Sequence, residues 1–221
     1  MKTNLSILVF LFLIGGSCSK ETESVDHKQI ASDNGCIEKI TIPASSQGTL
    51  TNADYNLILT LFSSNGISNP NFRFTRTYYR DSVQTYNGIH NFRNVIIIQY
   101  TNGLPIFRES LNYSFKNGIF ESYSGQLTNG TSLNTISTLS LGQLRKLFID
   151  DIELFDHKGK QYKDSCFKAE FGYFNLNAGT GNTSENLVKA WHLTPNFYSY
   201  PEAYYRDDTG ERIYYFNGIV Y

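Results

Sequence analysis

Positive charge is neither abundant nor clustered in this 221-residue sequence. Lysine and arginine number 19 against 20 acidic residues, which gives a formal net charge of −1, and no basic run occurs. Nucleic-acid-binding surfaces concentrate basic residues on one patch or stripe, so the sequence speaks against a nucleic-acid partner. Charged residues make up only 18% of the chain, whereas Tyr, Phe and Gly number 16, 16 and 17. This composition favours a sheet-dominated protein.

Catalytic and metal-binding signatures are also missing. The sequence has no His-Glu-x-x-His, no Gly-x-Ser-x-Gly, no phosphate loop and no dinucleotide fingerprint. The Asp-Asp pairs at 150–151 and 207–208 are typical of a helix end and a turn rather than of a catalytic dyad. We therefore expect a protein that is not an enzyme and that holds neither a metal nor a cofactor. No two histidines have zinc-ligand spacing; His27 lies near the N-terminus, His90 and His157 are expected in polar turns, and His192 on a strand.

The N-terminus has the parts of a secretory signal. Lys2 is followed by an apolar segment at 5–14 and by small residues at 15–17. The apolar segment is well short of the roughly 20 residues that a membrane-spanning helix requires. Cys18 directly after the small residues resembles the lipobox of bacterial lipoproteins, although Gly15 stands where leucine is usual. That resemblance implies a signal peptide at 1–17 and a membrane anchor through lipid on Cys18. The alternative is an ordinary signal peptide with a chance cysteine.

Residues 18–35 are polar and are expected to act as a flexible tether, because such a stretch buries too little apolar surface to order itself. Ser19 resembles an outer-membrane sorting signal, and Lys20 with Glu21 resembles a surface-export signal of some lipoproteins. These features predict an outer-membrane lipoprotein of the cell envelope. Both the periplasmic and the surface-exposed location stay open.

Two cysteines remain beyond Cys18, namely Cys36 and Cys166. In an oxidising compartment an isolated pair is most simply one disulfide, and we predict a Cys36–Cys166 bond. Two buried free thiols are the alternative.

Strands are predicted between repeated Asn-Gly turns. This dipeptide accepts the positive φ angles of a tight hairpin turn, and it occurs at 87–88, 102–103, 117–118 and 129–130. The strand-like runs between the turns are 72–83, 92–101, 106–115 and 119–127. Residues 95–98 are apolar without alternation, which suggests a central strand covered on both faces. Together these runs form an antiparallel meander.

Each group of strands follows a predicted helix. Thr51 with Asp54 resembles a capping box, and Asn65 with Gly66 supplies a stop; Ser140 with Gln143 marks the second helix start. Further strands are expected at 165–175, 187–194 and 203–221, and a linker at 128–138. The predicted fold class is therefore α+β, with two tandem units, at 36–130 and 131–221, each a helix packed on an antiparallel β-meander.

Two segments resemble a known pair of domains. Residues 95–107 (VIIIQYTNGLPIF), with 111–118 and 122–125, resemble the fungalysin/thermolysin propeptide domain. The second half is similar to the PepSY domain, through LVKAWHL at 187–193 and DDTGE at 207–211. In the family these domains precede a zinc metalloprotease, assist its folding and hold it inactive. Because this sequence contains no metalloprotease zinc motif, the resemblance implies binding or modulating a thermolysin-like metalloprotease, or another envelope protein, in trans.

The alternative is a structural or ligand-binding envelope lipoprotein, unrelated to proteolysis, that takes a peptide or glycan through exposed tyrosines. Partner binding is expected at the last strand, 213–221, which is the candidate sheet edge. Its apolar anchors would be Tyr214, Tyr215 and Phe216. The tyrosines at 78–79, 198, 200 and 204–205 either form such a sticky face or cap a two-sided core.

Overall fold

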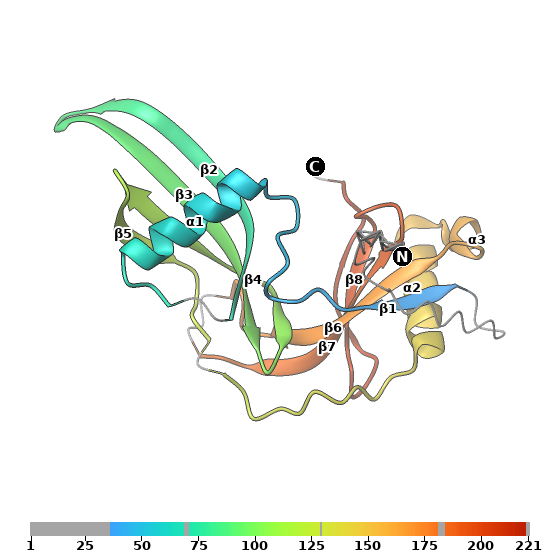
Figure 1. Ribbon diagram of the computed structural model, residues 1–221. Coiled ribbons are helices and arrows are strands. Elements are labelled where there is room, and N and C mark those ends of the chain that lie inside the picture. Colours follow the sequence, from blue (N-terminus) through green and yellow to red (C-terminus); the bar gives the residue numbers. More distant parts are fainter. Residues whose placement is uncertain (1–35, 69–70, 129, 181–183, 220–221) are drawn as a thin grey trace, which may run out of the picture. The chain divides into compact units, whose positions relative to one another are not determined.

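The structure is a computed structural model that describes residues 36–68, 71–128, 130–180 and 184–219 (Figure 1). The predicted signal peptide, the lipidation site Cys18 and the tether lie outside the described residues. Within these ranges the chain forms three helices and one mixed, mostly antiparallel sheet of nine strands, so the α+β class is confirmed. None of the three helices is long and apolar enough to cross a bilayer.

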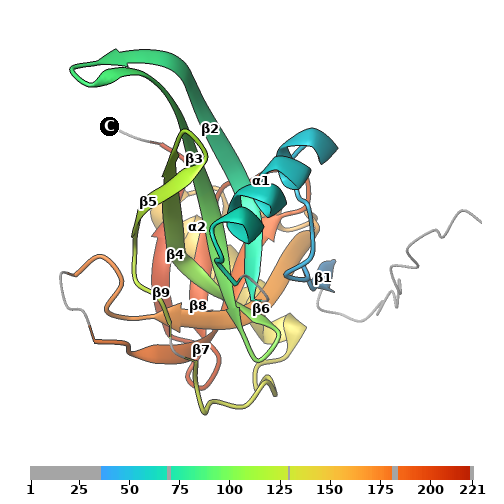
Figure 2. The same cartoon turned by 60° about the vertical axis from the view of Figure 1, so that its left-hand side comes forward.

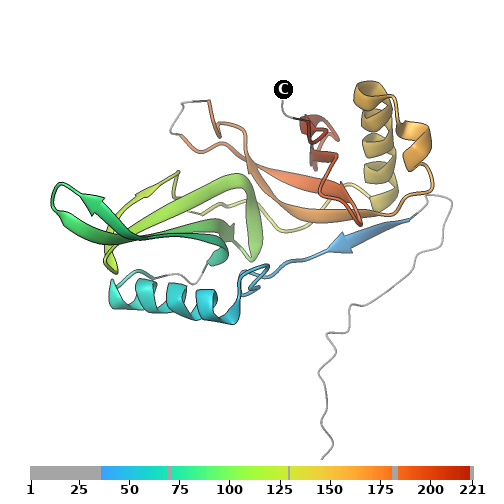
Figure 3. The same cartoon turned by 90° about the horizontal axis from the view of Figure 1, so that it is seen from above.

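Helix α1 (Asn52–Ser64) packs on a four-stranded meander of β2 (Phe72–Thr85), β3 (Gly88–Thr101), β4 (Leu104–Lys116) and β5 (Ile119–Ser124) (Figure 3). It begins where predicted, because the Thr51 hydroxyl accepts a hydrogen bond from the Asp54 amide at 3.1 Å. Asn65 caps the C-terminal end of α1. Its side-chain amide also donates a hydrogen bond, at 2.9 Å, to the Gly118 carbonyl in the turn between β4 and β5. The core beneath α1 is apolar and includes Ile58, Phe62, Phe74, Ile97, Leu111 and Phe115.

The expectation that 95–98 is covered on both faces is wrong for one face. Val95 and Ile97 are fully buried, whereas Ile96 and Ile98 are only half-buried. The reason is that α1 covers one face of the meander.

The hairpin of β2 and β3 extends past the β4–β5 turn, since Phe92 already pairs with Lys116 at the end of β4 (Figure 2).

The Asn-Gly turns differ from one another. Asn102 and Gly103 have φ angles of 51° and 76°, and the turn at 117–118 is similar, as the prediction requires. In the first turn only Gly88 has a positive φ, of 114°, because Thr85 pairs with Gly88 and the turn residues are Tyr86 and Asn87. The fourth Asn-Gly includes residue 129, which lies outside the described residues.

Helix α2 (Leu141–Asp156) and the short α3 (Gly159–Tyr162) precede β6 (Phe167–Asn175), β7 (Leu187–Pro195), β8 (Glu202–Arg206) and β9 (Arg212–Phe216). The capping box of Ser140 and Gln143 is complete, which confirms the predicted start of α2. Leu144, Phe148 and Ile152 on its inner face are fully buried. They pack against the face of the sheet that carries Phe167, Ala169, Trp191, Leu193 and Tyr205.

A bulge in β4 joins the two groups of strands. Residues 106–109 of β4 lie opposite the single residue Gln99 of β3, because Tyr100 pairs with Pro105 while Ile98 pairs with Ser110. Within this bulge Ile106 and Phe107 pair in parallel with Tyr173 and Phe174 of β6. Strand pairing therefore runs through one sheet, in the order β2-β3-β4-β6-β7-β8-β9, rather than closing into two separate meanders.

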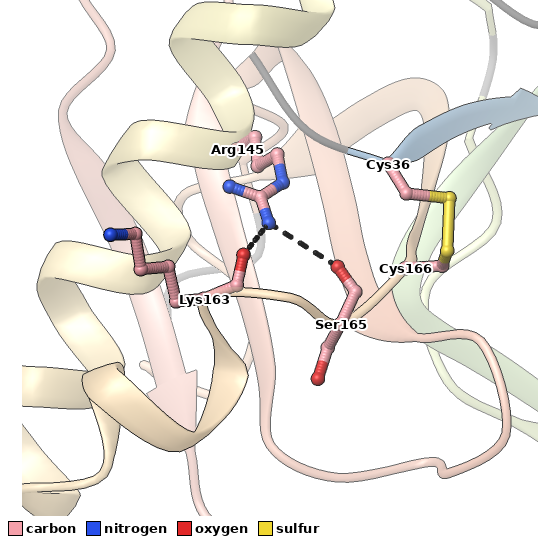
Figure 4. Close-up of a disulfide and its surroundings, with 5 residues drawn as sticks. All are labelled: Cys36, Arg145, Lys163, Ser165 and Cys166. Carbon is pink, nitrogen blue, oxygen red and sulfur yellow. Dashed lines mark hydrogen bonds between the residues drawn. A yellow bond between two sulfur atoms is a disulfide. The ribbon is translucent and has the colours of Figure 1, made fainter. Parts of the chain in front are cut away.

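Strand β1 (Ile37–Ile40) adds to the first half of β6 in parallel. The Cys36–Cys166 disulfide lies at the start of both strands and spans 130 residues of sequence (Figure 4). This bond agrees with the prediction from the cysteine count. It covalently fixes the beginning of the described chain to a central strand.

Candidate functional site

A row of polar side chains crosses the sheet face opposite α2. Side chains alternate between the faces of a strand, so the residues next to the buried Phe167, Ala169 and Trp191 point the other way. Glu170 of β6 pairs with His192 of β7, which in turn pairs with Tyr204 of β8. The register alone therefore places these three side chains next to one another on one face.

A cavity of about 440 Å³ lies over this row. Glu170, His192 and Glu202 line it from the sheet, and Ile40 and Ile42 line it from the segment around β1. The connection from β7 to β8, residues 196–201, borders the same cavity and is called the aromatic loop below. Its Phe197, Tyr198 and Tyr200 side chains are 91%, 70% and 46% exposed.

Glu170 is the buried acid of the cavity. It is 6% exposed, and burial raises its pKa, an effect that the charges of Arg73 and His192 and the Ile42 amide only partly offset. Its Oε1 atom is buried and has no hydrogen-bond partner among the described residues. An unsatisfied buried acceptor costs about 1–3 kcal/mol, so a ligand donor that reaches Oε1 after the covering side chains move would be stabilised here.

Glu202 holds the other end of the row in an ionic network. Its Oε2 lies 3.1 Å from His192 Nε2, and its Oε1 lies 3.4 Å from Arg108 Nη1. Burial alone would raise the pKa of Glu202, but the hydrogen bond and charge of His192 and the charge of Arg108 outweigh it, and the pKa is lowered. Tyr204 stacks on the His192 ring with centroids 4.4 Å apart, which fixes the imidazole.

Arg108 reaches this network because it lies in the β4 bulge. Its φ of 56° turns the strand, and its guanidinium lies 3.7 Å from the centre of the Tyr214 ring. Among the described residues, no group of three or more His, Cys, Asp or Glu side chains is placed to hold a metal ion. The site thus offers a hydrogen-bond acceptor at its floor, paired charges beside it and aromatic rings at its rim.

The predicted partner-binding residues lie in β9, at the end of the strand order, but their side chains are half-buried. Tyr215 stacks on Phe155 of α2 at 4.8 Å and donates to Asp156. Tyr214 lies beneath Arg108, and Phe216 contacts Tyr200 of the aromatic loop edge-on at 5.2 Å. These three side chains already pack within the protein, and within the described residues no strand pairs with the outer backbone edge of β9.

The sequence left open whether the other tyrosines form an exposed face or cap a two-sided core, and both cases occur. Tyr204 and Tyr205 are 5% and 1% exposed on opposite faces of β8, so this pair caps a two-sided core. Tyr78 and Tyr79 are 48% and 41% exposed, and Tyr198 and Tyr200 lie in the aromatic loop.

The predicted place is confirmed for one histidine and wrong for another. His192 lies on a strand as predicted, whereas His90 lies in β3 rather than in a turn, because the hairpin continues to Thr85 and Gly88. His157 ends α2 with a φ of 54°. His27 lies outside the described residues.

Sequence reasoning missed Glu170, Glu202 and Phe197. One signal was present: Glu170 is an acidic residue within the apolar run FKAEFGYF of a buried strand. Glu202 and Phe197 carry no such signal, because their partners lie on other strands.

The sequence matches no protein-family model, and no curated protein matches it either.

Proposed function

We infer that this protein is a lipid-anchored, non-catalytic binding protein of the cell envelope that captures a segment of another envelope protein in trans. One observation carries this proposal. Two large aromatic side chains of one short loop, Phe197 and Tyr198, are mostly exposed, beside a cavity with an unsatisfied buried carboxylate.

Aromatic side chains supply much of the binding free energy in protein interfaces, because each buries a large apolar area with little loss of side-chain freedom. Burial of apolar surface stabilises a complex by about 25 cal/mol per Å² before the costs of association. Phe197, which is 91% exposed, gains most from a partner. Glu170 adds selectivity for a donor such as a backbone amide or a basic side chain.

A propeptide-like arrangement of two tandem units is part of the proposal. It is supported by the separate cores: α1 packs with β2–β5, and α2 packs with β6–β8. In this arrangement the backbone edge of β9 is a second contact, which an extended partner segment would join as an added strand.

The anchor in this proposal is lipid on Cys18, supported by the signal-like N-terminus and the cysteine at its end. The Cys36–Cys166 bond favours an oxidising compartment, where disulfides persist. The polar tether would then hold the binding domain near a membrane surface.

Site-specific photo-crosslinking in intact cells tests the binding site. A benzophenone amino acid replaces Phe197 in one variant and Leu154 in a control variant. Leu154 is 62% exposed on α2, against the opposite face of the sheet. We expect a discrete crosslinked protein from position 197 and none from position 154. Equal crosslinking from the two positions, or none from position 197, would contradict the proposal.

The protease partner is tested separately. The full-length protein in detergent is added to a thermolysin-like protease, and both the progress curve and the refolding yield of the denatured protease are measured. We expect slower turnover or a higher yield, and a smaller effect with Phe197→Ser. If neither quantity changes while the crosslink persists, the partner is another envelope protein. If soluble glycans instead abolish the crosslink, the ligand-binding alternative is favoured.

A further inference from the structure

A second cavity, of about 540 Å³, is lined by α2 and the segment around α3 and shares no lining residue with the cavity beside the aromatic loop. Its charged lining consists of four cations and two acids, namely Arg145, Lys146, Lys160, Lys163, Asp150 and Glu153. The local charge is therefore 4 − 2 = +2, on a chain whose net charge is −1. This concentration of positive charge is local and small, unlike the extended stripe of a nucleic-acid surface.

Both acids of this cavity are already engaged. Asp150 Oδ2 lies 2.6 Å from Lys146 Nζ, and Glu153 Oε2 accepts the Gly159 amide at 2.8 Å. Lys160 and Lys163 form no ion pair with a described residue. An amide hydrogen bond does not cancel the charge of Glu153, so the net charge of +2 is that of Arg145 and these two lysines less that of Glu153.

Arg145 is a buried guanidinium without a carboxylate partner. It is 8% exposed, its Nη2 donates to the carbonyls of Lys163 and Ser165, and its Nε is buried without a hydrogen-bond partner. Burial lowers its pKa, and the charge of Asp164 only partly offsets this. A buried cation with unused donors is costly until an anion pairs with it.

The direction of these groups is visible in Figure 4. The end of the guanidinium not bonded to the carbonyls points to the same side as the Lys163 ammonium, away from the Cys36–Cys166 bond. Lys160 lines the same cavity from α3. Gly142, in the first turn of the 16-residue α2, also lines it, so the positive end of the helix dipole adds to the side-chain charge.

We propose that this cavity is a binding site for a phosphate monoester. A fixed guanidinium beside mobile ammonium groups matches a phosphate, whose charge of nearly −2 at neutral pH exceeds that of a carboxylate. The volume is within the range of small-molecule sites, and Ile149 provides an apolar wall. The ligand is therefore an organic phosphate, either a soluble one or the headgroup of a lipid.

The test is titration of the full-length protein in neutral detergent by calorimetry. The probes are glycerol 3-phosphate, inorganic phosphate and mixed micelles containing phosphatidic acid, each with glycerol or phosphatidylcholine as the uncharged or zwitterionic control. We expect saturable binding of at least one phosphate probe. Glycerol 3-phosphate binding assigns a soluble ligand, and binding of phosphatidic acid alone assigns a lipid headgroup. No saturable binding of any phosphate probe would overturn the site.

Variants locate the binding. Lys160→Gln and Lys163→Gln are each expected to weaken the affinity about tenfold, the value for loss of one charge-assisted hydrogen bond. Lys158→Gln is the matched control, because Lys158 is an exposed lysine in the same segment that does not line the cavity. An equal effect of Lys158→Gln would show a diffuse charge effect and overturn the proposal. Arg145→Lys is expected to abolish binding; if it unfolds the protein, the two exposed lysines still decide the test.

Discussion

Asp207 is a fully buried carboxylate that ties the linker and the start of α2 to the sheet. Its Oδ1 accepts the Thr138 amide at 2.8 Å, the Leu139 amide at 3.1 Å and the Trp191 indole at 2.9 Å. Lys189 Nζ lies 3.1 Å from its Oδ2 and compensates its charge. Nearly all of its acceptor capacity is therefore used by these four donor residues.

Replacing Asp207 by asparagine keeps the shape and removes the charge. The amide NH₂ then faces donors that need an acceptor, and each buried donor left unsatisfied costs about 1–3 kcal/mol. Because the contributions of neighbouring donors are not additive, we expect a loss of about 2–3 kcal/mol in the free energy of unfolding. Asp207→Ala leaves all these donors unpaired, and the expected loss is about 3–5 kcal/mol.

The pH dependence follows from the same contacts. Burial alone would raise the pKa of Asp207, but the hydrogen bonds of Thr138, Leu139 and Trp191 and the Lys189 ammonium outweigh it and hold the pKa below its usual 3.8. A carboxyl group whose pKa is lower in the folded state contributes stability above its unfolded pKa. That contribution is lost as the pH falls below about 4, so the stability of Asp207→Asn declines less steeply there than that of the wild type.

The assay is urea unfolding with the disulfide intact, followed by the fluorescence of Trp191, the single tryptophan of the chain. Asp208→Asn is the control, because Asp208 is adjacent and exposed and its ion pair is with Arg206 on the surface. Exposed ion pairs contribute about 0–1 kcal/mol, so this variant is expected to lose less than about 1 kcal/mol. Equal losses of unfolding free energy for the two variants would refute the reasoning. So would a free energy of unfolding that falls below about pH 4 as steeply in Asp207→Asn as in the wild type.

Three further predictions concern the anchor, the disulfide and the cavity floor. Cys18→Ala is expected to abolish labelling by a clickable fatty acid and to release the protein from membranes; labelling that survives would end the lipoprotein proposal. Replacing Cys36 and Cys166 by serine is expected to lower the free energy of unfolding through the entropy of the unfolded chain, nominally by several kcal/mol for a 130-residue loop, and so to lower the urea midpoint. Two thiols titrating in the unreduced, unfolded wild type would contradict the disulfide. Glu170→Gln is expected to maintain or increase stability at pH 8, because burial disfavours the charged form and the raised pKa makes Glu170 more destabilising as pH rises. A loss above about 1 kcal/mol would show that attraction to the charges of Arg73 and His192 outweighs burial.

Local interactions made much of the fold predictable. The starts of α1 and α2 depend on side chains three residues apart, Thr51 with Asp54 and Ser140 with Gln143, which a sequence displays directly. Hairpin turns at 102–103 and 117–118 depend on the positive φ that Asn and Gly accept. The prediction of the disulfide needed only the count of two cysteines beyond Cys18 and the expectation of an oxidising compartment.

The junction of the two strand groups was not predictable from local patterns. A period of two indicates which residues share a face, but it does not say which strand lies beside which. The parallel pairing of β4 with β6 depends on the bulge at 106–109, and the bulge also turns Arg108 toward Glu202 and Tyr214. Nothing in the sequence around Arg108 indicates partners on β8 and β9.

Both candidate binding sites depend on this tertiary arrangement. The sequence by itself determined α1, α2, most of the strands and the disulfide, because each follows from residues within a few positions or from composition; it did not predict α3 or β1. Only the tertiary structure brought Glu170 beside His192 and Arg145 beside Lys163. The physical reason is that a charged side chain becomes informative once its burial and its neighbours are fixed, and both are set by contacts between residues far apart in the chain.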